Sequence, residues 1–109
     1  MISWNDFEKI DIRVGTIIET KEFPKAKKPA YKLTIDFGNL GIKKSSAQIT
    51  YLYDKEKLLN KQVIAVINFP PKQIADFVSE CLVLGVVDDN NNVTLLQPDR
   101  KVENGLKIL

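Results

Sequence analysis

The chain has 109 residues, of which 44% are hydrophobic, and its formal net charge at pH 7 is +2. This length suits a single compact domain over residues 1–109, and so weak a charge does not by itself indicate a nucleic-acid-binding protein. Because the sequence has no histidine, it excludes Ser-His-Asp and Cys-His nucleophile systems and histidine metal sites. It also lacks the glycine-rich phosphate-binding motifs, so we expect no catalytic residue, no metal site and no cofactor.

The N-terminal residues combine a helix start with two large apolar side chains. Ser3 and Asp6 have the spacing of a capping box, which predicts a short helix. Trp4 and Phe7 lie within it, and two interpretations stay open for them: packing in the core or burial in a dimer interface. For a domain of this size, dimerisation would be a natural source of additional buried surface, and we predict that Trp4 and Phe7 contribute to such an interface.

Three strands are predicted in the first half of the chain. Residues 13–23 are rich in Thr, Ile and Val and predict the first strand. A lysine-bearing segment at residues 24–29, which we call the lysine loop, leads to residues 31–37, where apolar and polar side chains alternate. Turn residues at 38–41 then predict a hairpin into a polar return strand at 42–48.

Polar residues of the return strand form the first candidate site. Lys44, Ser46 and Gln48 share one face of the strand, because successive strand residues point to opposite faces. A lysine, a hydroxyl and an amide in a row suit contacts to sugar–phosphate and base edges; an ordinary exposed strand is the alternative. The lysine-rich stretch at residues 21–32 is open to the same two interpretations.

The second candidate site follows a core strand. After a short helix at 54–59 with Asp54 as its N-cap, the apolar run at 63–67 predicts a strand buried on both faces. It ends at residues 68–74, N-F-P-P-K-Q-I, which we call the strap. The two prolines restrict the backbone, so ordering Asn68 and Lys72 for a ligand costs little entropy. A simple turn is the alternative.

Aromatic side chains in and after the strap are candidates for contact with bases or peptides. Phe69 and Phe77, with Ser79 nearby, offer stacking or an apolar pocket, and core packing is the alternative for either ring. Further on, residues 81–87 and 93–96 predict two strands joined by a turn. The one cysteine, Cys81, lies in an apolar run and is predicted to be a small buried side chain.

A third candidate lies where the first helix meets the first strand. Arg13 can bind a phosphate or a carboxylate with its guanidinium, or pair locally with Asp11. Gly15 permits close backbone approach or a bulge. No apolar run reaches the roughly 20 residues that a membrane-spanning helix needs, and the N-terminus shows no apolar signal region. We expect a cytoplasmic protein without membrane insertion.

Many short strands with one or two short helices predict an all-β class, mainly strands with short helices. A five-stranded OB-fold barrel with short N- and C-terminal extensions fits the strand count. A β-sandwich fits it as well, and strand count alone does not separate the two.

Several segments together resemble the tRNA-binding domain family. Residues 11–17, D-I-R-V-G-T-I, are similar to its D-[IL]-R-V-G-x-I opening, and residues 68–72 are similar to its N-[FL]-x-P-[RK] segment. A proline-containing loop, a serine-bearing strand and a serine before an apolar strand agree in order. Within the family the resemblance is greatest to the small stand-alone bacterial members described as export-related chaperones, through residues 6–9, 22–24, 45–50, 68–71 and 95–99. The match covers nearly the whole chain.

This resemblance implies an OB-fold, a homodimer and no catalysis. It implies that tRNA and unfolded or export-bound polypeptides are partners, and it makes the translocation ATPase SecA a candidate partner. The RNA-facing residues that it implies are Arg13, Lys44, Ser46, Asn68, Lys72 and Ser79. Many synthetase-linked members have S-G-L at positions 46–48 and a Gly-Met pair at positions 80–81, where this chain has S-A-Q and E-C. Glu80 would repel phosphate, which weakens the expectation of tight tRNA binding.

Three functions therefore follow from the sequence as hypotheses. The first is a non-enzymatic chaperone in protein export that binds peptides through an apolar groove bordered by lysines. The second is a dedicated tRNA-binding module that acts in trans with synthetases or in tRNA metabolism. The third, a small enzyme, has no motif in its favour.

Overall fold

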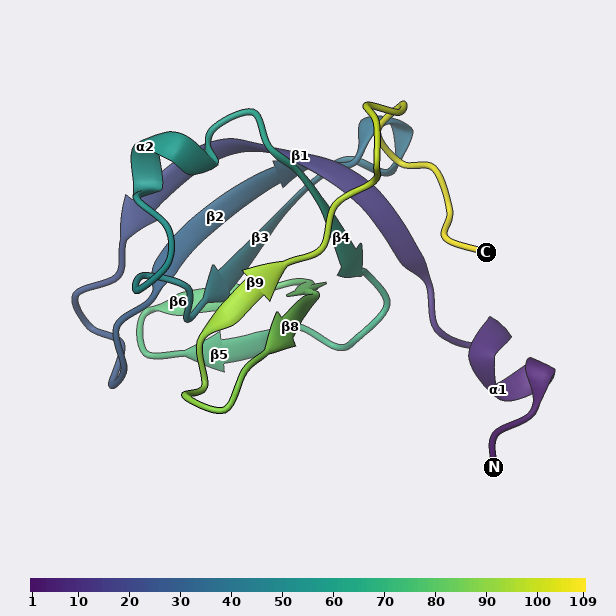
Figure 1. Cartoon of the computed structure of the whole chain (residues 1–109), viewed down its shortest axis with the longest axis horizontal. Coiled ribbons are helices and arrows are strands. Elements are labelled where there is room, and N and C mark those ends of the chain that lie inside the picture. Colours follow the sequence, from purple (N-terminus) through teal and green to yellow (C-terminus); the bar gives the residue numbers. More distant parts are fainter.

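The computed structural model describes all residues, 1–109, as a small barrel of strands with short helical pieces (Figure 1). The helical pieces are α1 (Trp4–Glu8), the 3₁₀ turn η1 (Gly38–Leu40) and α2 (Lys55–Leu58). The strands are β1 (Ile12–Glu22), β2 (Tyr31–Asp36), β3 (Ile42–Ala47), β4 (Gln62–Val66), β5 (Lys72–Ile74), β6 (Phe77–Ser79), β7 (Leu82–Val83), β8 (Gly85–Val87) and β9 (Val93–Leu95). Neither α1 nor α2 could span a membrane.

The main sheet has five antiparallel strands in the order β3-β2-β1-β4-β7. The long strand β1 curves across the molecule (Figure 1), pairing with β4 through its first half and with β2 through its second half. A register shift between Ile17 and Glu19 adds to the bend. One continuous sheet of this order is the OB-fold, as expected, and the β-sandwich alternative is wrong.

The barrel closes between β3 and the chain entering β7. The backbone N–H of Glu80 donates to the Lys44 carbonyl oxygen at 2.7 Å, and the Lys44 N–H donates to a Glu80 carboxylate oxygen at 2.9 Å. A side-chain carboxylate here takes the place of a backbone carbonyl. The edge of β3 at Lys44 is therefore already paired, which protects it from pairing with another chain.

The core confirms the predicted alternation of β2. Tyr31, Leu33 and Ile35 are buried and the residues between them are partly exposed. Gly15 of β1 lies beneath this layer, and a Cβ at Gly15 would come within 2.6 Å of the Ile35 side chain. Close approach, rather than a bulge, is therefore the reason for glycine there.

The C-terminal segment extends the sheet beyond the end of β2. Gly105 donates its N–H to the Val14 carbonyl at 2.7 Å, and Ile108 donates to the Ile12 carbonyl at 2.9 Å. The Gln62 side chain holds the same segment by donating to the Val102 carbonyl at 2.7 Å and accepting from the Val102 N–H at 3.0 Å. The backbone of β1 that β2 leaves unpaired is satisfied in this way.

The structure confirms the predicted cap of α1 but differs from the sequence prediction at α2 and at residues 81–87. The capping box of α1 is confirmed, because Ser3 and Asp6 each accept the other's backbone N–H. Asp54 occupies the N-cap position of α2, but its side chain accepts no hydrogen bond there. The predicted single strand at residues 81–87 is wrong: it divides into β7, which pairs with β4, and β8, which pairs with β9.

Candidate functional site

Two loops flank the outer face of β3. The lysine loop joins β1 to β2, and the chain between β4 and β7 contains the strap and the hairpin of β5 and β6. The strap is thus more than a rigid exit from a strand, because its second half is β5. OB-folds bind oligonucleotides and oligosaccharides through this strand face and these two loops. A ligand-binding site is therefore expected between them.

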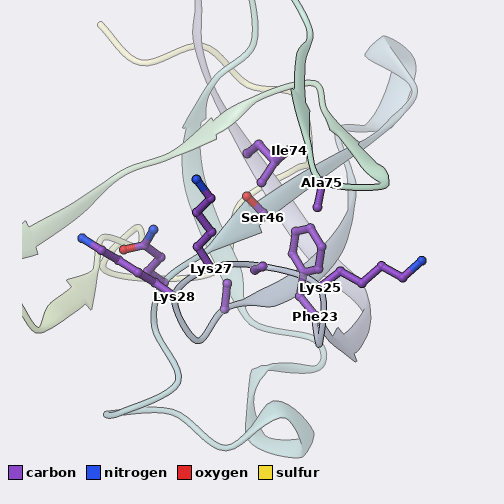
Figure 2. A pocket seen from close by; sticks show the side chains of 10 residues that line it. Phe23, Lys25, Lys27, Lys28, Ser46, Ile74 and Ala75 are labelled. Carbon is purple, nitrogen blue, oxygen red and sulfur yellow. The ribbon is translucent and has the colours of Figure 1, made fainter.

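A cavity of about 400 Å³ lies between the lysine loop and the β5–β6 hairpin (Figure 2). It is lined by Phe23, Lys25, Ala26, Lys27, Lys28, Ala30, Ser46, Gln48, Ile74 and Ala75. In Figure 2, Lys25 extends to one side of Phe23, and Lys27 and Lys28 extend to the other. The cavity thus has an apolar floor with cations along its rim.

The floor of this cavity belongs to a small second core. Phe23, Ala30 and Phe77 are buried together, and the two rings lie 5.4 Å apart at a 59° tilt. The Lys32 ammonium lies over both, 5.0 Å from the Phe23 centroid and 5.6 Å from that of Phe77. The expectation that Phe77 offers its ring to a ligand is therefore wrong, since packing against Phe23 covers it.

A second cavity, also about 400 Å³, adjoins the first. Its lining residues are Ser46, Phe69, Pro70, Lys72, Ile74, Ser79, Glu80, Cys81 and Leu82. Ser46 and Ile74 line both cavities, so the two form one continuous surface that we call the groove. Four predicted residues, Ser46, Phe69, Lys72 and Ser79, are brought together here. Phe69 is 53% exposed as a residue, so its side chain is accessible to a ligand.

The acidic residue in the groove is held by the barrel. Glu80 is half-buried, and one of its carboxylate oxygens accepts the Lys44 N–H. This hydrogen bond fixes the position of the carboxylate beside the groove but leaves its negative charge, so the predicted repulsion of phosphate remains. Beside it, burial raises the pKa of the Cys81 thiol to about 11. Cys81 is therefore a neutral core thiol at pH 7, as predicted.

Lys44 lies outside the two cavities. Its backbone closes the barrel, and its side chain is exposed on the same strand face as Ser46. It forms no ion pair within the protein. Lys44 can therefore add positive charge beside the groove without forming its wall.

Arg13 and Asn68 have structural partners away from the groove. The Arg13 Nε donates to Asp11 at 2.6 Å and an Nη donates to the Gly105 carbonyl at 3.1 Å. The local pairing with Asp11 is thus present. Asn68 accepts the Asp11 N–H at 2.9 Å and donates to the Lys9 carbonyl at 2.7 Å. The structure brings neither residue into the set that lines the groove, and both fasten the start of β1 to its surroundings.

Trp4 and Phe7 do not pack in the core. The Trp4 side chain is 83% exposed, and α1 projects away from the barrel beyond the start of β1 (Figure 1). A cavity of about 530 Å³ lies between α1 and the C-terminus. We call this surface the terminal face, made by Ile2, Trp4, Phe7, Ile10, Ile108 and Leu109. The core-packing interpretation is wrong, and the dimer interpretation remains a prediction.

Sequence reasoning missed part of the groove. It noted the lysine cluster without assigning Lys25, Lys27 and Lys28 to a site, and it did not single out Phe23. The available signal was the position of these residues: the loop between the first two strands of an OB-fold borders its binding face.

Comparison with known proteins agrees with the fold and with the motifs. Residues 12–107 match the model of the family described as "Putative tRNA binding domain". The structure of the CsaA chaperone protein from Picrophilus torridus is 59% identical, with a TM-score of 0.94, and the alignment covers 100% of both chains. The chaperone CsaA from Bacillus anthracis is 50% identical, with a TM-score of 0.96, over 100% of this chain and 99% of that one.

A curated relative is much longer than this chain. The methionine–tRNA ligase of Pyrococcus horikoshii is 40% identical over 107 residues, which are 98% of this chain but 14% of the ligase. The chain thus spans about one-seventh of the length of that curated relative. These matches confirm the family resemblance, and the chain belongs to the family of putative tRNA-binding domains, with CsaA chaperones among its relatives.

Proposed function

We propose that the protein is a non-enzymatic, CsaA-like molecular chaperone in protein export that binds unfolded polypeptides and tRNA through the groove. The observation that carries the proposal is the groove itself: an apolar surface bordered by lysines on the ligand-binding face of an OB-fold. Full-length similarity to two CsaA chaperones supports it.

The apolar part of the groove supports peptide binding. Phe69, Ile74 and Leu82 line it, and Phe69 and Leu82 are about half exposed. Exposed apolar side chains of this size gain favourable free energy when a partner covers them. An unfolded polypeptide offers apolar side chains from an extended chain, so it matches this surface without any single required sequence.

The cationic rim supports tRNA binding. Lys25, Lys27, Lys28 and Lys72 surround the groove, and only Lys25 has an acidic partner, Asp76 at 3.5 Å. Exposed lysines of this kind bind phosphates by releasing counterions. The second candidate function is a dedicated tRNA-binding module acting in trans, favoured by the similarity to part of a methionine–tRNA ligase.

Titrations across salt concentration separate the two ligand classes. We expect tRNA affinity to fall steeply as salt rises, because phosphate contacts release ions, whereas affinity for an apolar unfolded polypeptide should change little. Labelled tRNA and a permanently unfolded protein, measured by fluorescence anisotropy, provide the readout. Loss of the RNA function would be shown by absent tRNA binding at low salt, and loss of the chaperone function by absent polypeptide binding at every salt concentration.

A homodimer formed through the terminal face completes the proposal. The face is apolar, and a small domain gains buried surface by covering it with a second copy. We place the protein in the cytoplasm, where tRNA is found. SecA remains the candidate partner for delivery of clients, and co-sedimentation of purified SecA with the client-loaded protein tests it.

A further inference from the structure

A second cationic concavity lies outside the groove. A hollow of about 350 Å³ is lined by Asn60, Lys61, Gln62, Gln97, Pro98, Asp99, Arg100 and Lys101. We call it the polar hollow. Unlike the groove, it contains no aromatic side chain and Pro98 is its one apolar residue, so its recognition groups are mainly cations and amides.

Hydrogen bonds hold one wall of the polar hollow and the end of the other. The Asn60 N–H donates to the Ile17 carbonyl at 2.8 Å, and the Ile17 N–H donates to the Lys61 carbonyl at 2.9 Å. The opposite wall ends at Val102, whose N–H and carbonyl both bond to the Gln62 side chain. The backbone that carries Lys61 is therefore held against β1, and the wall that carries Arg100 and Lys101 is held at its end, Val102.

The charges in the polar hollow are unpaired. Lys61, Arg100 and Lys101 contribute three cations, and Asp99 is the one carboxylate. None of these four side chains forms an ion pair within the protein. Three unneutralised cations around one hollow attract a ligand that carries several negative charges.

The polar hollow shares no lining residue with the groove. In Figure 1 the loop after α2 and the chain that follows β9 pass over the top of the barrel, whereas β5, β6 and the lysine loop lie at its lower side. The molecule measures 39 × 30 × 28 Å. We therefore expect a short single strand that fills the groove to leave the polar hollow free, whereas a large folded RNA can contact both.

We propose that the polar hollow is a second RNA contact, which binds the phosphodiester backbone of a folded RNA whose other part occupies the groove. A free small anion fits less well, since Arg100 and Lys101 are exposed and no buried donor is available to hold one ion. Polyanion binding needs only mobile surface cations, because its free energy comes from counterion release. The inference rests on tRNA being a ligand of the groove, as proposed above.

Two RNA ligands and three variants test the inference. In the Arg100→Ala/Lys101→Ala variant, we expect tRNA affinity at about 0.1 M salt to fall about tenfold and the salt slope to decrease by about two. Affinity for a single-stranded RNA of about six nucleotides, a length that one OB face accommodates, should not change. The control Lys9→Ala/Lys57→Ala also removes two cations, each paired to a carboxylate outside both sites, and should leave both affinities unchanged.

The Lys72→Ala variant separates this inference from the proposed function. It should weaken both RNA ligands, since Lys72 lies in the groove. The second contact is overturned if Arg100→Ala/Lys101→Ala leaves tRNA binding unchanged, or if it weakens the short strand and tRNA equally. Groove binding would stand in both cases. If the unsubstituted protein binds neither RNA, both the RNA function and the second contact are lost. Inorganic phosphate at millimolar concentration should not compete; effective competition would indicate a small-anion site instead.

Discussion

The groove and the terminal face are both exposed and partly apolar, yet their chemistry differs. The groove combines Phe69 and Ile74 with the lysines of its rim, and Ser46 and Ser79 add hydroxyl groups. On the terminal face, large apolar side chains such as Trp4 and Leu109 predominate. A surface that mixes cations, hydroxyls and exposed rings suits flexible or charged ligands, whereas a mainly apolar one suits a permanent partner. The difference agrees with our proposal that ligands bind at the groove and that a second copy binds at the terminal face.

The largest expected effect concerns the terminal face. We expect Trp4→Ala/Phe7→Ala to weaken the dimer by at least about 100-fold, because buried aromatic residues at the centre of an interface each contribute roughly 2 kcal/mol or more. Sedimentation velocity over a concentration series measures the change. The exposed Ile42→Ala variant, on β3 outside the terminal face, is the matched control and should dimerise normally.

Removal of residues 1–9 deletes all of α1 and is a stronger test of the role of the terminal face in dimerisation. The barrel should still fold, because α1 contains no buried residue. A folded variant that remains a full-strength dimer would show that α1 does not form the interface. The apolar terminal face would then need another explanation.

The next effect concerns the apolar part of the groove. We expect Phe69→Ala to lower affinity for an unfolded polypeptide about tenfold, because it removes one of the larger exposed rings from the surface. The loss should be the same at low and high salt, and anisotropy measures it. Tyr51→Ala removes an exposed ring outside the groove and should have no effect. Equal losses in the two variants would contradict a localised peptide site.

A smaller effect distinguishes a structural from an RNA-binding role for Asn68. We expect Asn68→Ala to lower the free energy of unfolding by about 1–2 kcal/mol, because the Asp11 N–H and the Lys9 carbonyl lose their partner. Urea denaturation measures this change. Affinity for tRNA should stay within about twofold. A large loss of tRNA affinity without loss of stability would return Asn68 to the RNA-binding set.

The sequence predicted the barrel better than the site. Alternation in β2 and the turn at η1 are local patterns, so their elements could be read directly. The break between β7 and β8 was missed, because a continuous apolar run does not reveal that its two halves pair with different strands. The pairing of Glu80 with Lys44 depends on tertiary structure in the same way.

Individual site residues also show that the sequence does not reveal which strands pair. Lys72 and Ser79 were correctly expected to lie together, and they are direct partners across the β5–β6 hairpin. Phe77 is on the same hairpin, but its side chain is buried in the small second core with Phe23 and Ala30. Which face a residue of a short strand presents depends on the register of pairing. The turn that joins β5 and β6 contains Ala75 with a φ of +52°. An alanine does not indicate this left-handed conformation, so the register of the hairpin could not be predicted from the sequence.

The smallest predicted effect tests the charged part of the groove. We expect Lys72→Ala to weaken tRNA binding a few-fold at moderate salt and to reduce the salt slope by about one, because one phosphate contact is lost. Lys57→Ala, which removes an exposed lysine paired with Asp54, is the control and should leave the slope unchanged. Since Lys72 and Phe69 line the same cavity, the two variants together decide how that cavity is used. If Phe69→Ala changes only polypeptide binding and Lys72→Ala only tRNA binding, one cavity holds two ligands by separate forces. Competition between the ligands for the unsubstituted protein would then follow from their overlap in space, without any change in conformation.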